Sequence, residues 1–298
     1  MLYRYLPTKK NIVVPPTYIW TERNFPTTGV WSDITFGNGM FVAVGNLVST
    51  SPDGINWTNR TPHASIINSI TYGGGKFVAT TFGGSNSIMY SDDGIVWNSV
   101  DVSSLLVGGT MRDVSYGNGL YVVVLENTAR VLTSPNGITW TARTLPSNTR
   151  WGSIVFANGK FIAVSLNSAV SAVSTDGISW SGVAIPITSN VRIDYFKGMF
   201  VVYQWDSGQY ATSTSGTTGS WTSRTHETGR YYASASSPNV HMTLSFQSDS
   251  SVATSDGINW STSPMIGTAR QWLAVAYGNG VFVAIASNTN IAATTPSD

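Results

Sequence analysis

Short apolar runs follow one another along the chain, and each is stopped within about six residues by Gly, Ser, Asn or Asp. The segments 32–36 and 40–44 are separated by Gly-Asn-Gly, and the segments 47–51 and 55–59 by a Pro-Asp-Gly turn. Glycine and asparagine tolerate the positive φ that tight hairpins need. The pattern therefore predicts four antiparallel strands, followed by a crossing. No apolar period of helical spacing extends beyond two turns, which excludes helical solenoids.

Two phrases recur at a regular spacing. An aromatic residue, a glycine turn and an apolar strand occur seven times, at 36–44, 72–80, 116–124, 156–164, 195–203, 236–244 and 277–285. A turn leading to tryptophan is complete six times, at 51–57, 91–97, 134–140, 174–180, 215–221 and 254–260. From Trp20 to Trp260 is 240 residues over six steps, or 40 per repeat. This period is typical of a four-stranded propeller blade.

The two ends of the chain are offset by half a repeat. The last repeat ends at 291–298, where its tryptophan strand should begin, whereas the segment 18–26 reads like 55–62 without a turn before it. If the first strand pairs into the last blade, the ring closes and both sheet edges are protected. The sequence therefore predicts an all-β fold, a single seven-bladed β-propeller of four-stranded antiparallel blades over residues 17–298, preceded by an arm at 1–16.

Composition excludes several classes of protein. Of the 298 residues, 10% are charged and 12% are aromatic, which is unlike a disordered chain. The formal net charge of +1 provides no field for nucleic acid or an anionic membrane surface. The absence of cysteine removes disulfides, thiolate chemistry and sulfur-ligated zinc. The first ten residues lack the apolar core of a signal peptide, and no run of 18 apolar residues occurs, so we expect neither secretion by that route nor membrane insertion.

The phrase Ser-Xaa-Asp-Gly-Xaa-Xaa-Trp, as at 51–57 and 91–97, resembles the Asp-box of sialidase-like propellers. The whole repeat, over 18–298, resembles those of phage tail and virion proteins. In Asp-box families an extra residue usually separates Asp from Gly, whereas Asp53 and Gly54 are adjacent here. We interpret the phrase as a fold motif, in which Asp or Ser oxygens bind backbone N–H groups, Gly adopts the left-handed conformation and Trp packs against the neighbouring blade.

The resemblance to sialidases implies a demanding set of catalytic residues. Those enzymes carry three arginines for the substrate carboxylate, a tyrosine nucleophile paired with a glutamate, and an acidic general acid. The chain has only three glutamates, Glu22, Glu126 and Glu227. Glycosidases need two carboxyl groups about 5 to 9.5 Å apart, and the spacing forces no such pair. We therefore predict a protein that is not an enzyme and has no catalytic residues.

The histidines and acidic runs do not indicate a metal site. His63 and His226 lie in different crossings, and His241 replaces an aromatic residue in a strand, where we expect a core histidine. The acidic turn at 91–93 lacks the six to eight oxygens that calcium takes. We predict no metal and no cofactor.

One face of the predicted propeller gathers the crossings, which vary in length and chemistry, as at 98–110 and 261–271. Variation on a rigid scaffold can build specificity. At the start of the inner strands this face carries aromatic and guanidinium groups that could stack on sugar rings and bind hydroxyl or carboxylate groups. These candidate ligand-binding residues are Trp31, Arg150, Trp151, Arg192, Arg230, Tyr231, Arg270 and Trp272. The irregular loop at 203–210 adds Trp205, Asp206 and Tyr210.

The same side chains also fit a structural role as wedges between adjacent blades, and the sequence leaves both roles open. A second group of arginines recurs in the pattern Trp-Xaa-Xaa-Arg on the fourth strand, and we expect these to be structural. They are Arg23, Arg60, Arg143 and Arg224.

The arm at 1–16 alternates apolar with basic residues and ends in Pro15-Pro16, which favours an extended conformation. It could dock on another protein or form a frayed terminus. Our hypothesis is a non-enzymatic phage virion protein, attached to other virion proteins through this arm and presenting its loops to a host-surface glycan or protein. The alternative is a free glycan-binding lectin, cytoplasmic or exported by a non-classical route. A sialidase-like hydrolase is the third possibility.

Overall fold

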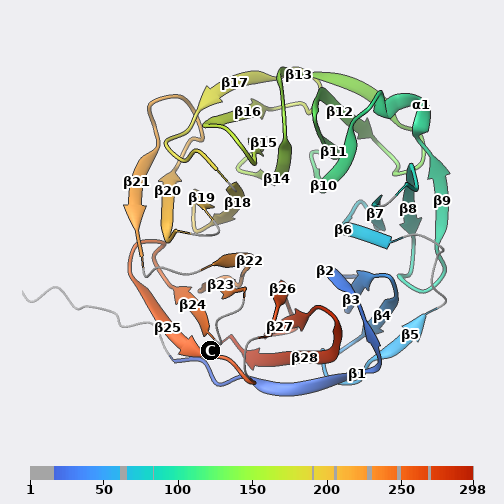
Figure 1. Ribbon diagram of the computed structural model, residues 1–298, viewed down its shortest axis with the longest axis vertical. Coiled ribbons are helices and arrows are strands. Elements are labelled where there is room, and N and C mark those ends of the chain that lie inside the picture. Colours follow the sequence, from blue (N-terminus) through green and yellow to red (C-terminus); the bar gives the residue numbers. More distant parts are fainter. Residues whose placement is uncertain are drawn as a thin grey trace, which may run out of the picture.

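The computed structural model describes residues 17–60, 66–82, 84–189, 191–204, 207–226, 230–246, 250–267 and 270–297. Seven four-stranded antiparallel sheets are arranged as blades around a central axis (Figure 1). The innermost strands surround the axis and the fourth strands form the rim. The predicted all-β, seven-bladed propeller is confirmed.

Blades 1 to 6 each use four consecutive strands, and blade 7 combines the last three strands with the first. Blades 1 to 3 contain β2 (Trp31–Gly37), β3 (Met40–Gly45), β4 (Val48–Ser51), β5 (Thr58–Arg60), β6 (Ile66–Gly73), β7 (Lys76–Phe82), β8 (Ser87–Ser91), β9 (Asn98–Asp101), β10 (Thr110–Gly117), β11 (Leu120–Glu126), β12 (Thr128–Ser134) and β13 (Thr141–Thr149). Blades 4 to 6 contain β14 (Trp151–Ala157), β15 (Lys160–Ser165), β16 (Val170–Ser174), β17 (Ser181–Ala184), β18 (Val191–Phe196), β19 (Met199–Gln204), β20 (Gln209–Ser213), β21 (Thr222–Thr225), β22 (Tyr231–Ser236), β23 (His241–Ser245), β24 (Ser250–Thr254) and β25 (Trp260–Pro264). Blade 7 contains β26 (Trp272–Gly278), β27 (Val281–Ala286), β28 (Thr289–Pro296) and β1 (Thr21–Gly29).

Blade 7 closes the ring with strands from both ends of the chain. β1 pairs antiparallel with β28, so that Thr21 lies opposite Thr294 and Asn24 opposite Ile291. Figure 1 shows the blue β1 along the outer edge of the red β28. Just before β1, the Trp20 indole N–H donates to the Ser251 hydroxyl of blade 6 at 3.0 Å. The half-repeat offset of the sequence is therefore the strand exchange that joins the last blade to the first.

Glycines at the end of the inner strands allow neighbouring blades to approach closely. A Cβ added to Gly37 would lie 2.1 Å from the ring of Tyr72, which belongs to the next blade. The same contact joins Gly73 to Tyr116. The recurring aromatic-glycine phrase therefore specifies the interfaces between adjacent blades, which we call seams, because the aromatic ring of one blade covers the backbone of the preceding blade.

In the seam between blades 5 and 6, the aromatic residue and the small residue exchange positions. Phe196 is equivalent to Gly37, because each pairs with the first residue of the following strand. Ser236 stands where the other seams have the aromatic ring of the following blade. The Phe196 ring stacks on His241, with centroids 5.7 Å apart. The large side chain comes from the preceding blade and the small one from the following blade.

The turn to the fourth strand is held by side-chain oxygens. The Ser51 hydroxyl accepts the Gly54 N–H at 2.9 Å, and one Asp53 oxygen accepts the N–H groups of Ile55 and Asn56, each at 2.8 Å. Burial alone would raise the pKa of Asp53, but these hydrogen bonds to the ionised form hold it well below its ordinary value. The Trp57 indole donates to the Gly54 carbonyl.

Two local predictions need correction. The fourth strand of blade 1 begins at Thr58 rather than at residue 55, because Asp53 holds the preceding segment in the turn. The segment 98–110, predicted as a crossing, begins with the fourth strand of blade 2, β9 (Asn98–Asp101), and continues with one turn of helix, α1 (Ser103–Leu106). None of the helices described is long and apolar enough to cross a membrane.

The predicted structural arginines bind the neighbouring strand. In four blades the arginine Nε donates to a threonine hydroxyl of the third strand, as in Arg60 to Thr50 at 2.8 Å and Arg224 to Thr212 at 2.9 Å. The other two pairs are Arg23 with Thr294 and Arg143 with Thr133. Their structural role is confirmed.

Candidate functional site

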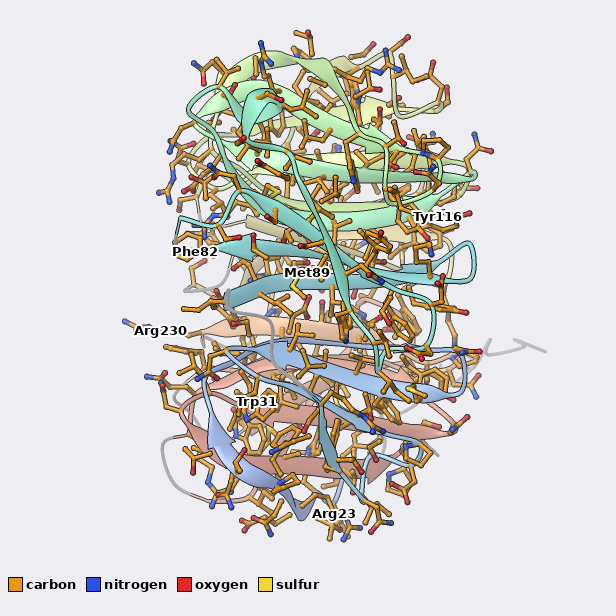
Figure 2. The ribbon with its side chains drawn as sticks, turned by 90° about the vertical axis from the view of Figure 1, so that its right-hand side faces the viewer. Arg23, Trp31, Phe82, Met89, Tyr116 and Arg230 are labelled. Atoms are coloured by element: carbon orange, nitrogen blue, oxygen red, sulfur yellow. The ribbon has the colours of Figure 1, made fainter. Side chains whose placement is uncertain are left out.

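The propeller has two different faces. We call one the loop face, where the second and third strands connect and each crossing enters the next blade. Figure 2 shows Phe82, at the end of β7, and Arg230, just before β22, at this edge. Tyr116, next to the hairpin between β10 and β11, lies toward the opposite edge, the hairpin face.

The central channel widens on the loop face into a cavity of about 320 Å³, which we call the channel mouth. Its charged residues are Asp33, Arg112, Asp113, Arg150 and Arg192, and its aromatic residue is Tyr232. A second cavity of about 190 Å³ is also lined by Asp33, Asp113 and Arg192, together with Asp194 and Tyr203. These three shared side chains therefore lie where the two cavities meet.

The backbone of the inner strands positions these side chains. In six blades the pairing of the first two strands is shifted near its start, as between Trp31 and Asp33. β18 pairs without a shift, so Arg192 has the register of Asp33. Around the channel this position is occupied, in blade order, by Asp33, Ser69, Asp113, Ser153, Arg192, Ala233 and Ala274. At this position blade 5 carries the long cationic side chain of Arg192, whereas the first four blades carry short polar side chains.

The two aspartates of this ring tie adjacent blades together. Asp33 accepts the backbone N–H of Ile70 in blade 2 at 2.9 Å. Asp113 accepts the N–H of Ile154 in blade 4 at 2.9 Å, and its other oxygen accepts the Ser69 hydroxyl of blade 2 at 2.8 Å. Each carboxylate also accepts the N–H of the residue that follows it. Most of the acceptor capacity of these carboxylates is therefore used within the scaffold.

The enclosed channel changes the titration of Asp33. Burial away from bulk water and the nearby Asp113 carboxylate raise its pKa to about 6, against the opposing effects of the Ile70 and Ile34 N–H groups and the Arg192 cation. The side chain is still partly accessible from the channel. The charge of the channel mouth therefore changes close to neutral pH.

Arg192 is the central cation of the channel mouth. Its guanidinium carbon lies 4.3 Å from the ring centroid of Tyr232, a cation–π contact. Within the described part of the chain it forms no ion pair with a carboxylate, and no hydrogen bond from its guanidinium is present. The donors of this group are therefore not used by the scaffold.

Two further arginines share one carboxylate at the rim of the channel mouth. Arg112 donates to Glu126 at 3.0 Å, and Arg150 reaches the same carboxylate oxygen at 3.2 Å. The Arg150 side chain is 45% exposed. One negative charge compensates two positive ones, so the rim retains a net positive charge.

The structure buries the candidate aromatic residues of the inner strands. Trp31, Trp151, Trp272 and Tyr231 lie in the core, and the three indoles have no exposed surface. The Trp31 indole donates to the Thr289 carbonyl of blade 7, and that of Trp151 to the Ser147 carbonyl of blade 3. These residues are the wedges between blades that the sequence allowed. Their rings are not available to a ligand in this arrangement.

The remaining candidates are scattered. Tyr210 is buried, and its hydroxyl accepts the Trp260 indole N–H at 3.0 Å in the seam with blade 6. Arg270 forms an ion pair with Glu22 at 2.9 Å, and Arg230 is exposed before β22. Of the predicted residues that the structure describes, only Arg150 and Arg192 line the channel mouth.

Several predictions fall on parts of the chain that the structure does not describe. Trp205, Asp206, Glu227, His63 and the arm at 1–16 lie outside the described residues. The roles proposed for them stay predictions.

His241 is a core residue, as predicted. It has no exposed surface, and its Nδ1 lies 2.9 Å from the Ser236 hydroxyl and 3.7 Å from an Asp194 oxygen. Burial lowers its pKa, against the opposing effect of Asp194. Ser236 and Asp194 approach the same ring nitrogen, and Nε2 is buried without a hydrogen-bond partner among the described residues. This arrangement cannot relay a proton from serine to aspartate through the ring.

No cluster of three or more His, Asp and Glu side chains suited to a metal ion is found among the residues that the structure describes. The sequence did not indicate Asp33, Arg112, Asp113 and Tyr232 as site residues. A comparison of equivalent positions in the inner strands could have found the aspartates, because polar residues recur there where a core position would be apolar.

Comparisons with known proteins support the fold. The family model described as "DUF6242 beta propeller domain" matches residues 91–193. No curated protein matches the chain. Among solved structures, the chain is similar to "YCF48 bound to D1 peptide", with a TM-score of 0.74, 15% identity and coverage of 94% of this chain and 95% of that one. It is also similar to a "Streptogramin B lyase structure", with a TM-score of 0.81, 11% identity and coverage of 94% and 98%. Virginiamycin B lyase from Staphylococcus aureus gives a TM-score of 0.79, 11% identity and coverage of 94% and 100%.

Proposed function

We propose that this propeller is a non-catalytic recognition module and that the channel mouth is its binding site. The observation that carries the proposal is a concave, charged cavity of about 320 Å³ on the variable loop face, held by the rigid inner strands. Binding sites are commonly concave and combine a fixed scaffold with a few oriented polar groups. YCF48, a protein of the same fold, is described with a bound peptide, which supports the choice of a binding function.

Two features support a non-catalytic role. The carboxylates of Asp33 and Asp113 accept hydrogen bonds from backbone N–H groups of adjacent blades, which gives both groups a structural role that requires no substrate. In the group of Ser236, His241 and Asp194 the histidine is fully buried, and the serine hydroxyl and the carboxylate approach the same ring nitrogen, which is the wrong geometry for activating a nucleophile. We expect no hydrolysis of a fluorogenic sialoside and no consumption of quinupristin, the compound described with virginiamycin B lyase. Turnover of either compound would contradict the non-catalytic proposal.

Selection from a peptide display library, together with a glycan array, tests the binding function. Leu166 lines the channel mouth, and Leu166→Trp should obstruct it. Ile178→Trp is the matched control, because Ile178 is 45% exposed on the hairpin face. We expect ligands that bind the wild type and Ile178→Trp equally and Leu166→Trp at least about tenfold more weakly. If no ligand is recovered, or Leu166→Trp binds as well as the wild type, the channel mouth is not the binding site.

The attachment to a phage particle is the finer part of the proposal. It is supported by the resemblance of the repeats to those of tail and virion proteins, and by a rigid ring that presents variable crossings on one face. Mass spectrometry of purified particles from the host that carries the gene tests it. Recovery in the free protein fraction alone would favour the lectin alternative.

A further inference from the structure

The polar groups of the channel mouth are unevenly satisfied. The carboxylates of Asp33 and Asp113 together accept five hydrogen bonds from the scaffold. In contrast, the guanidinium of Arg192 makes no hydrogen bond to the described part of the chain, although a guanidinium has five N–H donors. At the rim, Arg112 and Arg150 share a single Glu126 oxygen. The cavity thus offers unused N–H donors, and a complementary ligand must bring acceptors.

The planar fork of a guanidinium matches a carboxylate, which it can bind through two parallel hydrogen bonds. Arg192 is held by the Tyr232 ring at 4.3 Å, which restricts its orientation and lowers the entropy lost on binding. Arg112 and Arg150 line the same cavity and keep donors that Glu126 does not use. An anionic group entering the channel mouth therefore meets one oriented guanidinium and two at the rim.

The aromatic surface distinguishes a peptide from a sugar. Sugar sites commonly use an accessible aromatic face, and the only ring lining the channel mouth among the described residues is Tyr232. Arg192 covers this ring, and Phe246 packs beside it with centroids 5.7 Å apart. Trp31, Trp151 and Trp272 are buried. The described cavity lacks a stacking platform, so it suits an acidic side chain or a terminal carboxylate better than a sugar ring.

We propose that the channel mouth recognises an acidic peptide, with a carboxylate of the ligand bound by Arg192 and oriented by the arginines at the rim. This inference rests on the proposed binding function and specifies its ligand. A cavity of about 320 Å³ is at the small end of ligand pockets and accommodates one or two side chains. The rest of the peptide would lie across the loop face.

Calorimetric titration at low salt tests the proposal with defined probes. The probes are triglutamate, triglutamine as the neutral analogue, and glucuronate as an acidic sugar. The variants are Arg192→Gln, Arg192→Lys and Lys197→Gln. Lys197 is exposed on the hairpin face, so its substitution removes the same charge at a distance from the channel mouth. Thermal unfolding of each variant shows whether it is folded.

We expect triglutamate to bind the wild type and Lys197→Gln alike, and Arg192→Gln at least about tenfold more weakly, since a charge-assisted hydrogen bond is lost. Arg192→Lys should lie between them, because it keeps the charge without the fork. Equal binding of triglutamine would overturn carboxylate recognition, and equal or tighter binding of glucuronate would overturn the choice of a peptide. Unchanged affinity in Arg192→Gln, or no binding of triglutamate, would overturn the inference itself.

The two proposals can fail separately. If the display selection yields ligands that need an open channel mouth but carry no acidic residue, the binding function stands and the acidic peptide is wrong. If Leu166→Trp has no effect on any selected ligand, the binding function at this site fails first.

Discussion

The Asp113 carboxylate of blade 3 accepts the backbone N–H of Ile154 in blade 4 at 2.9 Å. A residue that faces the channel thus connects two blades that share no strand. The same carboxylate accepts the hydroxyl of Ser69 from blade 2, so three blades meet at one side chain. The polar ring of the channel is therefore part of the scaffold as well as the floor of the proposed binding site.

Loss of the hydrogen bonds that Asp113 accepts from blades 2 and 4 should destabilise the propeller. Asp113→Ala leaves the Ile154 N–H and the Ser69 hydroxyl without an acceptor, and we expect a loss of about 2–4 kcal/mol in the free energy of unfolding, measured in urea. Asp92→Ala is the matched control. Asp92 is 78% exposed and forms only a surface ion pair with Lys76, so its removal should cost less than about 1 kcal/mol. Equal effects of the two substitutions would contradict the structural role of Asp113.

The seam between blades 5 and 6 predicts a compensating pair of substitutions. Phe196→Gly should cost about 3–5 kcal/mol, because it removes a buried ring that stacks on His241. Ser236→Phe should also destabilise, because Phe196 already fills the seam. The double variant restores the arrangement of the other seams and should lose less than the sum of the two single variants. Thermal unfolding of all four proteins checks this, and simple additivity would show that the two positions do not exchange roles.

The buried His241 predicts a loss of stability in acid. Its pKa is lowered in the folded protein, so below its ordinary value of 6.5 the unfolded chain takes up a proton that the folded state resists. The free energy of unfolding should therefore fall as the pH decreases through 6.5. His241→Phe places the residue found at the equivalent position in Phe41, and it removes the buried, unpartnered Nε2.

Comparison of His241→Phe with the wild type isolates this effect, because other titrating groups are common to both proteins. We expect the variant to be more stable than the wild type, by a margin that grows between pH 7.5 and 5.5 in urea unfolding. A margin that shrinks in acid would contradict the neutral, buried state of His241.

Asp33 predicts a pH-dependent affinity. Its pKa is raised to about 6, above the ordinary value of 3.8. As the pH falls, Asp33 therefore takes up its proton at a higher pH in the folded protein than in the unfolded chain. Its contribution to stability is present in acid and is lost as the pH rises through 6. The channel mouth carries Asp33 and Asp113 against Arg112, Arg150 and Arg192, with Glu126 paired to two of these arginines. Protonation of Asp33 therefore adds one net positive charge.

Triglutamate should bind the wild type about threefold to tenfold more tightly at pH 5.5 than at pH 7.5, because the probe remains ionised while Asp33 is neutralised. Asp33→Asn should show a flatter pH dependence over the same range, provided that circular dichroism shows it to be folded. Weaker binding by the wild type at pH 5.5 would contradict the assigned titration.

The sequence predicted the blades and the ring closure because both depend on local signals. Gly-Asn-Gly and Asp-Gly turns set the hairpins, and the unpaired Trp20 strand required a partner at the other end of the chain. The arginines of the fourth strand were also interpreted correctly, since Arg60 and Arg224 both bind threonines of the third strand.

The proposed binding site was harder to predict. A tryptophan such as Trp31 can stack on a ligand or wedge between blades, and residue type does not distinguish the two roles. The strand register distinguishes the two roles, because it decides which side chains face the channel. The register shift between Trp31 and Asp33 interrupts the alternation of side chains along the strand, so the sequence alone does not show which residue faces the channel. The regular register of β18 places Arg192 at the level of the aspartates, which follows only from the pairing.

The most direct test of recognition at the channel mouth is the side-chain Nε–H signal of Arg192 in an NMR spectrum, assigned by its loss in Arg192→Gln. Our prediction is that the signal shifts saturably when triglutamate is added and stays unchanged with triglutamine. A signal that remains in place while those of other arginines shift would contradict it.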